Sequence, residues 1–436
     1  MLLIYTEKVT NRVTYIFDVI FNRLLGIEFT ITSDEKEFKS SRKAKLSYGK
    51  DPLGSEMFFR AVGLLFEKEI ESQELTFIEY EGHKAFFQVH GDASAMPFDP
   101  FAASFYLISR YEEYLPYVRD EYGRFEAAQS IAYREGFLKQ PLVNIWAEKI
   151  GRLVEERYKS ITVREKKFTF IPTIDVDSAW FFKAKGLIRN LGGFIRSLFR
   201  LELSGFAERV GVITGFREDP FDTYRQQIKV IKKYQIELIY FILFAEYARN
   251  DKNLPVNNKK FQVLIKGLGD YAEVGIHSSY NSSFYHDKLR TEVKKLSQVL
   301  NKEITRVRQH FTRLNLPATY RNFLSSGIRN DYSMGYMHHP GFRAGICDPF
   351  PFYDLDMDHV TSLIVCPFSF AFTSTSPHPS EENLSVAKEI INTVKSVNGT
   401  LVMVWENTYL RKGLKGEDNL KLFEEVVKMA SDKALS

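Results

Sequence analysis

The chain has 436 residues, and at roughly 150 residues per domain this length is too great for one ordinary core, so we expect two domains. Hydrophobic residues make up 44% and charged residues 26%, proportions that are typical of folded globular proteins and give no indication of disorder. The net charge is only +4, with Lys and Arg spread along the chain, which argues against a nucleic-acid partner.

The sequence shows no export or membrane signal. Residues 1–21 meet charged side chains before any long apolar run, unlike a signal peptide. No segment reaches the roughly 18 apolar residues of a transmembrane helix. Cys347 and Cys366 are too few for a disulfide framework and lack the spacing of a structural zinc site, so we predict two buried thiols and a cytosolic location.

Residues 1–163 are expected to form a smaller N-terminal domain of mixed α+β structure, accessory to the rest. Apolar and alternating runs predict strands at 2–5, 27–32, 43–49, 74–81 and 84–90, of which the last two form a hairpin. An apolar stripe predicts a helix over 13–25. Asp99 is the expected N-cap of a helix over 100–115, and Pro141 opens another over 141–158.

Residues 164–436 alternate between strand and helix, which predicts βα units and a distorted (β/α)7 barrel that folds without the first part. The expected strands are 168–174, 236–244, 272–277, 304–310, 327–333, 359–370 and 400–405. The expected helices include 221–234, 286–300, 316–327, 380–397 and 419–431. An insertion over 179–220 carries a basic amphipathic run at 186–203. It is expected to cover the barrel or contact the other domain, with a lid or membrane-surface role as the alternative.

Ionisable residues stand where four predicted barrel strands end. Asp175 and Asp177 end the first strand, and His277, His310 and Glu406 end the third, fourth and last. Each alone would more often be a capped or hydrogen-bonded polar residue. Because the carboxyl ends of parallel strands converge on one rim, their joint placement indicates a functional site.

One carboxylate with two imidazoles is a common open ligand set for Zn²⁺ or a similar divalent ion, and zinc is the expected cofactor. Asp175 and Asp177 are two residues apart in an extended segment, so both can face the rim. One would bind the ion and the other would take a proton from water. Such a site suits the hydrolysis of an amide or ester.

Several motifs occur in a characteristic order: TIDVD, GIHSSYNS, VRQHFTR, GFRAG followed by PFPFYDL, and MVWENT. In this order the chain resembles the metal-dependent polysaccharide deacetylases, carbohydrate esterase family 4. It looks closest to a bacterial branch with an extra N-terminal domain, whose pattern is similar to PFDPFAASFYLISRYEEYL, DEYGRF, AAQS and GFLKQPLVNIW. The resemblance covers nearly the whole chain and implies a carbohydrate substrate.

The resemblance implies Asp175 as general base, with Asp177 and His277 as metal ligands. The family's third ligand is a His four residues after the first, where this chain has Asn281, so either His310 or Asn281 completes the set.

The remaining roles are less uniform. Arg308 and Arg343 would orient the base or bind substrate, or form ordinary salt bridges. Tyr280 and Trp405 would stack on a sugar ring, or pack in the core. Glu406 stands where the family has a His that acts as general acid. Glu406 would take that role only if its carboxyl group is protonated, or else remain an ionised structural group.

The adjacent His338 and His339 cannot easily bind one ion together and are expected at the surface or facing substrate.

Two functions follow from these residues. The first is a metal-dependent hydrolase that removes acetyl groups from N-acetylated sugars or glycans. The alternative is a catalytically impaired or redirected carbohydrate-binding protein acting in surface-polysaccharide assembly, which Asn281 and Glu406 keep open. The sequence gives no indication of the oligomeric state.

Overall fold

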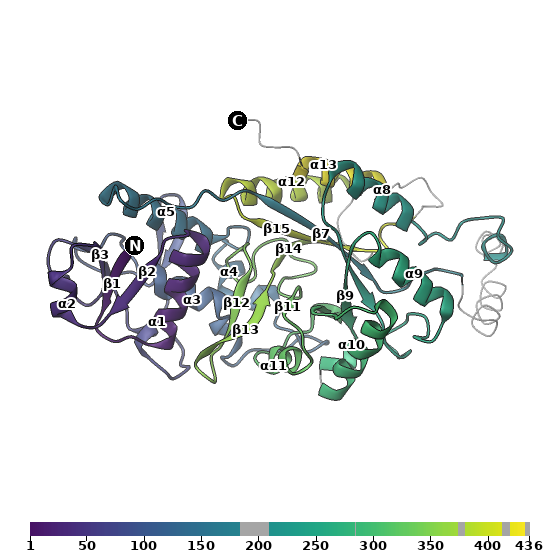
Figure 1. Cartoon of the computed structure of the whole chain (residues 1–436), viewed down its shortest axis with the longest axis horizontal. Coiled ribbons are helices and arrows are strands. Elements are labelled where there is room, and N and C mark those ends of the chain that lie inside the picture. The colour runs from purple at the N-terminus through teal and green to yellow at the C-terminus, as the bar shows by residue number, and fades with distance from the viewer. Residues whose placement is uncertain (184–208, 284, 374–379, 412–418, 432–436) are drawn as a thin grey trace.

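A computed structural model of the chain describes residues 1–183, 209–283, 285–373, 380–411 and 419–431. The first part of the chain lies at one end of an elongated molecule, and the second part fills the rest (Figure 1). The amphipathic run predicted at 186–203 lies outside the described residues. Among the described residues, no helix combines the length and apolar character needed to span a membrane.

The first part contains a four-stranded sheet in the order β2-β1-β3-β4, and every pair in it is parallel. The strands are β1 (Leu2–Thr6), β2 (Phe29–Thr32), β3 (Ala44–Gly49) and β4 (Met57–Arg60). The predicted hairpin is confirmed as β5 (Phe77–Tyr80) and β6 (His83–Phe86). Its two turn residues are Glu81 and Gly82, both left-handed, so His83 belongs to the strand and not to the turn.

Helices of the first part are α1 (Asn11–Phe17), α2 (Glu35–Ser40), α3 (Pro100–Ile108), α4 (Ile131–Arg134) and α5 (Leu142–Arg157). The predicted cap is confirmed, since the Asp99 carboxylate accepts hydrogen bonds from the backbone N–H groups of Phe101 and Ala102. Helix α3 is shorter than predicted because Arg110 adopts a left-handed φ of 55°. The helix predicted over 13–25 changes after α1 into a π-helical segment, Asp18–Leu24.

The second part is built on a nine-stranded sheet in the order β12-β13-β11-β10-β9-β8-β7-β15-β14, in which only β12 pairs antiparallel. The strands are β7 (Thr169–Val176), β8 (Ile239–Leu243), β9 (Glu273–Ser278), β10 (Arg306–Gln309), β11 (Asn330–Asp331), β12 (Phe350–Asp354), β13 (His359–Val365), β14 (Phe368–Phe372) and β15 (Thr400–Glu406). The strand predicted over 359–370 is therefore two strands, separated at Cys366 and Pro367, because proline cannot donate to the ladder.

This sheet is curled, as a distorted barrel requires. The ring of Phe241 on β8 lies 5.2 Å from that of Tyr332, which follows β11, although β9 and β10 stand between these strands. The guanidinium of Arg308 lies over the rings of both Phe241 and Phe368, at 4.6 and 5.6 Å. Side chains from distant strands thus fill a common interior, and the predicted α/β class with a distorted parallel barrel is confirmed as a half-barrel.

Helices cover the outside of this sheet (Figure 1). They are α8 (Tyr224–Tyr234), α9 (Lys259–Gly269), α10 (His286–Leu300), α11 (Ala318–Ser325), α12 (Ser380–Ser396) and α13 (Asn419–Ser431). Helix α9 was not among the predicted helices.

The two parts of the chain share one hydrophobic core. The ring of Tyr15 in α1 packs 4.8 Å from that of Tyr353 in β12, and the Asn144 amide donates to the Asp348 carboxylate at 2.7 Å. The shared core argues against the expectation that residues from about 164 onward fold alone. Without the first part, apolar side chains of the second part that now pack against it would face water.

Candidate metal centre

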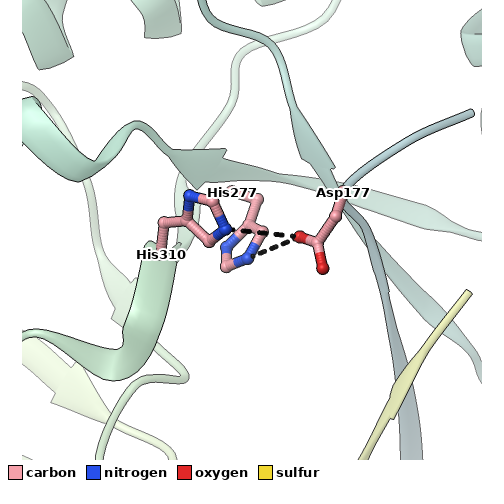
Figure 2. Close-up of side chains that lie close together, drawn as sticks. All are labelled: Asp177, His277 and His310. Carbon is pink, nitrogen blue, oxygen red and sulfur yellow. Dashed lines mark ion pairs between the residues drawn. The ribbon is translucent and has the colours of Figure 1, made fainter. Parts of the chain in front are cut away.

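Three predicted ligands meet at the carboxyl edge of the curled sheet. Asp177 follows β7, His277 lies near the end of β9, and His310 follows β10, so parallel strands of one sheet deliver them to the same edge. One ligand atom from each lies within 4.8 Å of the other two. The Nε2 atoms of His277 and His310 lie 3.2 and 3.7 Å from Asp177 Oδ1 (Figure 2). The site therefore brings His310 together with Asp177 and His277.

Both imidazoles are oriented through their other ring nitrogen. His277 Nδ1 lies 2.8 Å from the backbone carbonyl oxygen of Arg308, and His310 Nδ1 lies 2.9 Å from the Asp251 carboxylate. Both partners accept hydrogen bonds, so each Nδ1 carries a proton and donates it. Once an ion displaces the second proton of such a ring, its Nε2 lone pair faces the cluster, which is the arrangement that a metal-binding histidine needs.

The charges of the cluster are strongly coupled. Burial lowers the pKa of His277, but the Asp175 and Asp177 carboxylates outweigh it and raise that pKa to about 9. Burial alone would raise the pKa of Asp177, whereas the adjacent His277 and His310 lower it. The ionised form of the Asp177 carboxylate is thus stabilised by positive charge beside it.

The donor set fits a divalent metal. Asp177 Oδ1 is buried, and the Nε2 atoms of His277 and His310 lie 3.2 and 3.7 Å from it. Without an ion, protonated His277 offsets the charge of this carboxylate, and a divalent cation bound by the same three atoms would replace that proton. One carboxylate oxygen and two imidazole nitrogens match the three-ligand sites that zinc uses when a position stays open for substrate.

Asp175 lies beside this cluster and is held by a buried arginine. Arg308 Nη1 donates to Asp175 Oδ1 at 2.8 Å and to Thr173 Oγ1 at 2.7 Å, while Arg308 Nε donates to the carbonyl oxygen of Tyr332. The Arg308 side chain is fully buried. Arg308 therefore holds Asp175 in a buried ion pair and is not part of the cavity wall.

A cavity of about 590 Å³ opens on the cluster. Its wall includes Asp175, Asp177, His277, His310 and Glu406. Glu406 pairs in register with Asp175 across β15 and β7, and its Oε2 accepts a hydrogen bond from Thr408 Oγ1 at 3.2 Å. All five ionisable residues that the strand-end pattern selected thus face one cavity.

Three residues expected to contact substrate do not line the cavity: Trp405, Arg343 and Tyr280. Trp405 is fully buried and stacks on Phe372 with ring centroids 4.9 Å apart, so it is a core residue. Arg343 forms a buried ion pair with Glu113 of the first part at 2.7 Å and lies outside the cavity wall. Tyr280 is also absent from that wall and packs edge-on against Phe311.

Sequence reasoning missed several residues of the site. Asp251, which binds His310, lies eight residues beyond the end of β8, so the same strand-end argument would have found it if extended into the following loop. Glu121, Tyr122 and Arg124 of the first part also line the cavity; they belong to the DEYGRF motif, to which no role in the site was assigned. His338, expected at the surface or facing substrate, lines the cavity too, and burial lowers its pKa, which keeps that imidazole uncharged at neutral pH.

The two cysteines are buried, as predicted.

The fold and the cluster together define an α/β half-barrel with a candidate divalent-metal site at the carboxyl edge of its strands. A family described as being of unknown function, DUF7033, matches residues 2–159 of the chain. No curated protein matches the chain.

Solved structures resemble the chain at low identity. A Mycobacterium smegmatis protein described as a polysaccharide deacetylase shares 10% identity and a TM-score of 0.41, over 62% of this chain and 86% of its own. A polysaccharide deacetylase from Bacillus cereus shares 9% identity and a TM-score of 0.30, over 61% and 86%. A CE4 family pseudoenzyme from Bacillus anthracis shares 8% identity and a TM-score of 0.31, over 61% and 60%. Because these TM-scores lie below 0.5, the function proposed next rests on the residues of the site.

Proposed function

We propose that the protein is a metal-dependent hydrolase that removes acetyl groups from an N-acetylated sugar or glycan, with zinc as the ion. The observation that carries this proposal is the cluster of Asp177, His277 and His310, whose imidazoles both turn Nε2 toward one carboxylate oxygen while Asp175 lies beside them. A structural ion pair would not require two imidazoles, each oriented through its Nδ1, at the wall of a cavity.

In this proposal Asp177, His277 and His310 hold the ion. The ion supplies positive charge that polarises an acyl carbonyl and makes water easier to deprotonate. Asp175 takes the proton from the attacking water, and Arg308 fixes the direction of its carboxylate. The departing amine takes its proton from water, and Glu406, on the same wall, accepts a hydrogen bond from that amine. The cavity wall, partly formed by Tyr122 and Met337, limits the water around the reacting groups.

The second candidate function is carbohydrate binding without catalysis, in surface-polysaccharide assembly. It is favoured by two observations: Asp175, the proposed base, is buried and accepts a hydrogen bond from Arg308, and Glu406 stands where an imidazole acid is expected. A buried pair of arginine and carboxylate also suits a purely structural role.

The test combines metal content with acetate release. Wild type, His277→Ala and Asp175→Asn are purified, their zinc is measured by elemental analysis, and each is incubated with N-acetylated oligosaccharides. We expect one bound ion in wild type and in Asp175→Asn, none in His277→Ala, and acetate release from wild type alone. His339→Ala is the matched control, because His339 packs on Tyr133 away from the cluster.

Two results would contradict the proposal. A zinc content in His277→Ala equal to that of wild type would contradict the proposed metal site. A wild type that holds zinc and binds the oligosaccharide but releases no acetate would support the binding protein instead.

A further inference from the structure

A short hairpin from the first part of the chain reaches into the metal cavity. We call residues 119–125 the front hairpin; an isolated β-bridge between Arg119 and Phe125 closes it. Asp120 organises its turn, because Oδ1 accepts hydrogen bonds from the backbone N–H groups of Tyr122 and Arg124 at 2.9 and 2.7 Å. Arg124 Nε donates to Asp120 Oδ2 at 2.6 Å. The hairpin is therefore internally braced.

The metal-binding edge opposite this hairpin has an unusual backbone. Directly after His310, Phe311 and Thr312 both adopt left-handed conformations, with φ of 59° and 49°. Such a conformation is unfavourable for residues with a Cβ, most of all for bulky or β-branched ones, and two in succession persist only where neighbouring groups hold them.

The front hairpin supplies those neighbouring groups. The Tyr122 ring stacks on the Phe311 ring, with centroids 5.0 Å apart and planes inclined by 27°. Arg124 Nη1 donates to the Phe311 carbonyl oxygen at 3.1 Å, and the Arg124 guanidinium lies 4.9 Å above the Tyr122 ring. Ring and backbone of Phe311 are thus each held by one residue of the hairpin.

Further contacts fix the hairpin to the same segment. Arg119 Nη2 donates to Asn315 Oδ1 at 2.8 Å. Gly123 is left-handed, with φ of 77°, and a Cβ there would meet Arg313 Nη2 at 2.9 Å, so the backbone approaches as closely as only glycine allows.

Phe311 passes this constraint to the metal cluster. Its ring lies 4.5 Å from the His310 ring, and the two residues are adjacent in the chain. We infer that Tyr122 and Arg124 are positioning residues, which hold Phe311 in its left-handed conformation and thereby direct His310 Nε2 toward Asp177. The consequence for metal binding and catalysis rests on the proposed function. The orientation of the His310 ring can be measured in the metal-free protein and does not. The first part of the chain is then a component of the site.

The test compares Tyr122→Ala with Tyr122→Phe, which keeps the stacked ring. Tyr133→Ala is the matched control, since the exposed Tyr133 ring packs on His339 and lies outside the front hairpin and the cavity wall. The first readout is the imidazole NMR spectrum of the metal-free protein, with His277 and His310 assigned from single variants. The second is the affinity for Zn²⁺ alone, measured by competition with a chromophoric chelator.

In Tyr122→Ala we expect the ring signals of His310 to shift and broaden while those of His277 stay, together with an affinity for Zn²⁺ at least about tenfold weaker. Tyr122→Phe and Tyr133→Ala should match wild type in both readouts. If Tyr122→Ala does not fold, Tyr122→Leu replaces it, because Leu retains apolar contact without a stacked ring.

Unchanged His310 signals in the folded variant would overturn the inference, as would equal movement of the His277 and His310 signals. A wild type that binds no Zn²⁺ would overturn the proposed function, and the NMR comparison would still decide whether Tyr122 positions His310.

Discussion

Replacing Asp251 should weaken metal binding although this residue does not face the ion. Asp251 is almost fully buried, and its Oδ1 accepts two hydrogen bonds, from His310 Nδ1 and from the backbone N–H of Tyr280, each at 2.9 Å. Asp251→Asn can keep both bonds through the amide oxygen and loses only the charge. Asp251→Ala loses both bonds and leaves His310 free to rotate. Loss of such a partner costs about 10- to 100-fold in metal affinity, so we expect about tenfold for Asn and about 100-fold for Ala.

These factors correspond to about 1.4 and about 2.7 kcal/mol of binding free energy. The assay is Zn²⁺ titration by competition with a chelator, with thermal unfolding recorded in parallel. Glu292→Gln serves as control, because this neighbouring buried carboxylate accepts from the Ser279 N–H and contacts neither imidazole. Burial raises the pKa of Glu292 to about 7, so Gln resembles its protonated form. An affinity for Zn²⁺ equal to wild type in Asp251→Ala would refute the reasoning.

Three further predictions concern other buried groups. Glu113→Ala should lower the free energy of unfolding by about 3 to 5 kcal/mol in urea titrations, because Arg343 would remain buried without its carboxylate and Arg110 would keep only Glu112. Burial raises the pKa of Asp99 to about 6, above the roughly 3.9 of an unfolded chain. The folded state thus binds this proton more tightly, so its contribution to stability is complete below about pH 4 and is lost as the pH rises through 6. Asp99→Asn should flatten that slope in thermal unfolding between pH 4 and 7. Glu406→Gln should keep most of the acetate release, since Glu406 is partly exposed and accepts a hydroxyl hydrogen bond, as an ionised carboxylate does.

Each of these has a matched comparison. Glu389 forms an exposed ion pair with Lys139, and Glu389→Ala should change the free energy of unfolding by at most about 1 kcal/mol; an equal loss in both variants would contradict the burial argument. A slope that stays the same in Asp99→Asn would assign the pH dependence to other groups. Loss of activity in Glu406→Gln with recovery in Glu406→His would identify Glu406 as the general acid.

The strand-end argument located the cluster because it depends only on short-range order. Asp175, Asp177, His277, His310 and Glu406 each stand within one or two residues of the end of an apolar strand, and parallel strands place such ends on one edge. The same periodicity established the βα order of the second part.

What the sequence could not indicate depends on contacts between distant segments. Trp405 sits next to Glu406, but alternation along β15 turns its ring into the core, onto Phe372 and Phe423. Tyr122 reaches Phe311 from 189 positions earlier in the chain, and no local pattern predicts that pair. The parallel sheet of the first part was not distinguished either, because short strands carry no record of their partners.

The arginine inside the half-barrel pairs with the residue proposed as the catalytic base, so the same pair affects both stability and activity. Arg308 lies between Phe241 and Phe368 with the Asp175 carboxylate as its counter-charge, so losing either member of the pair strands the other in an apolar interior. A lineage that abandons catalysis would therefore keep both residues or replace both together. An intact Asp175 and Arg308 in a relative is consequently poor evidence that the relative is active, whereas the fate of His277 and His310, which the interior does not need, reports on whether the ion is still used.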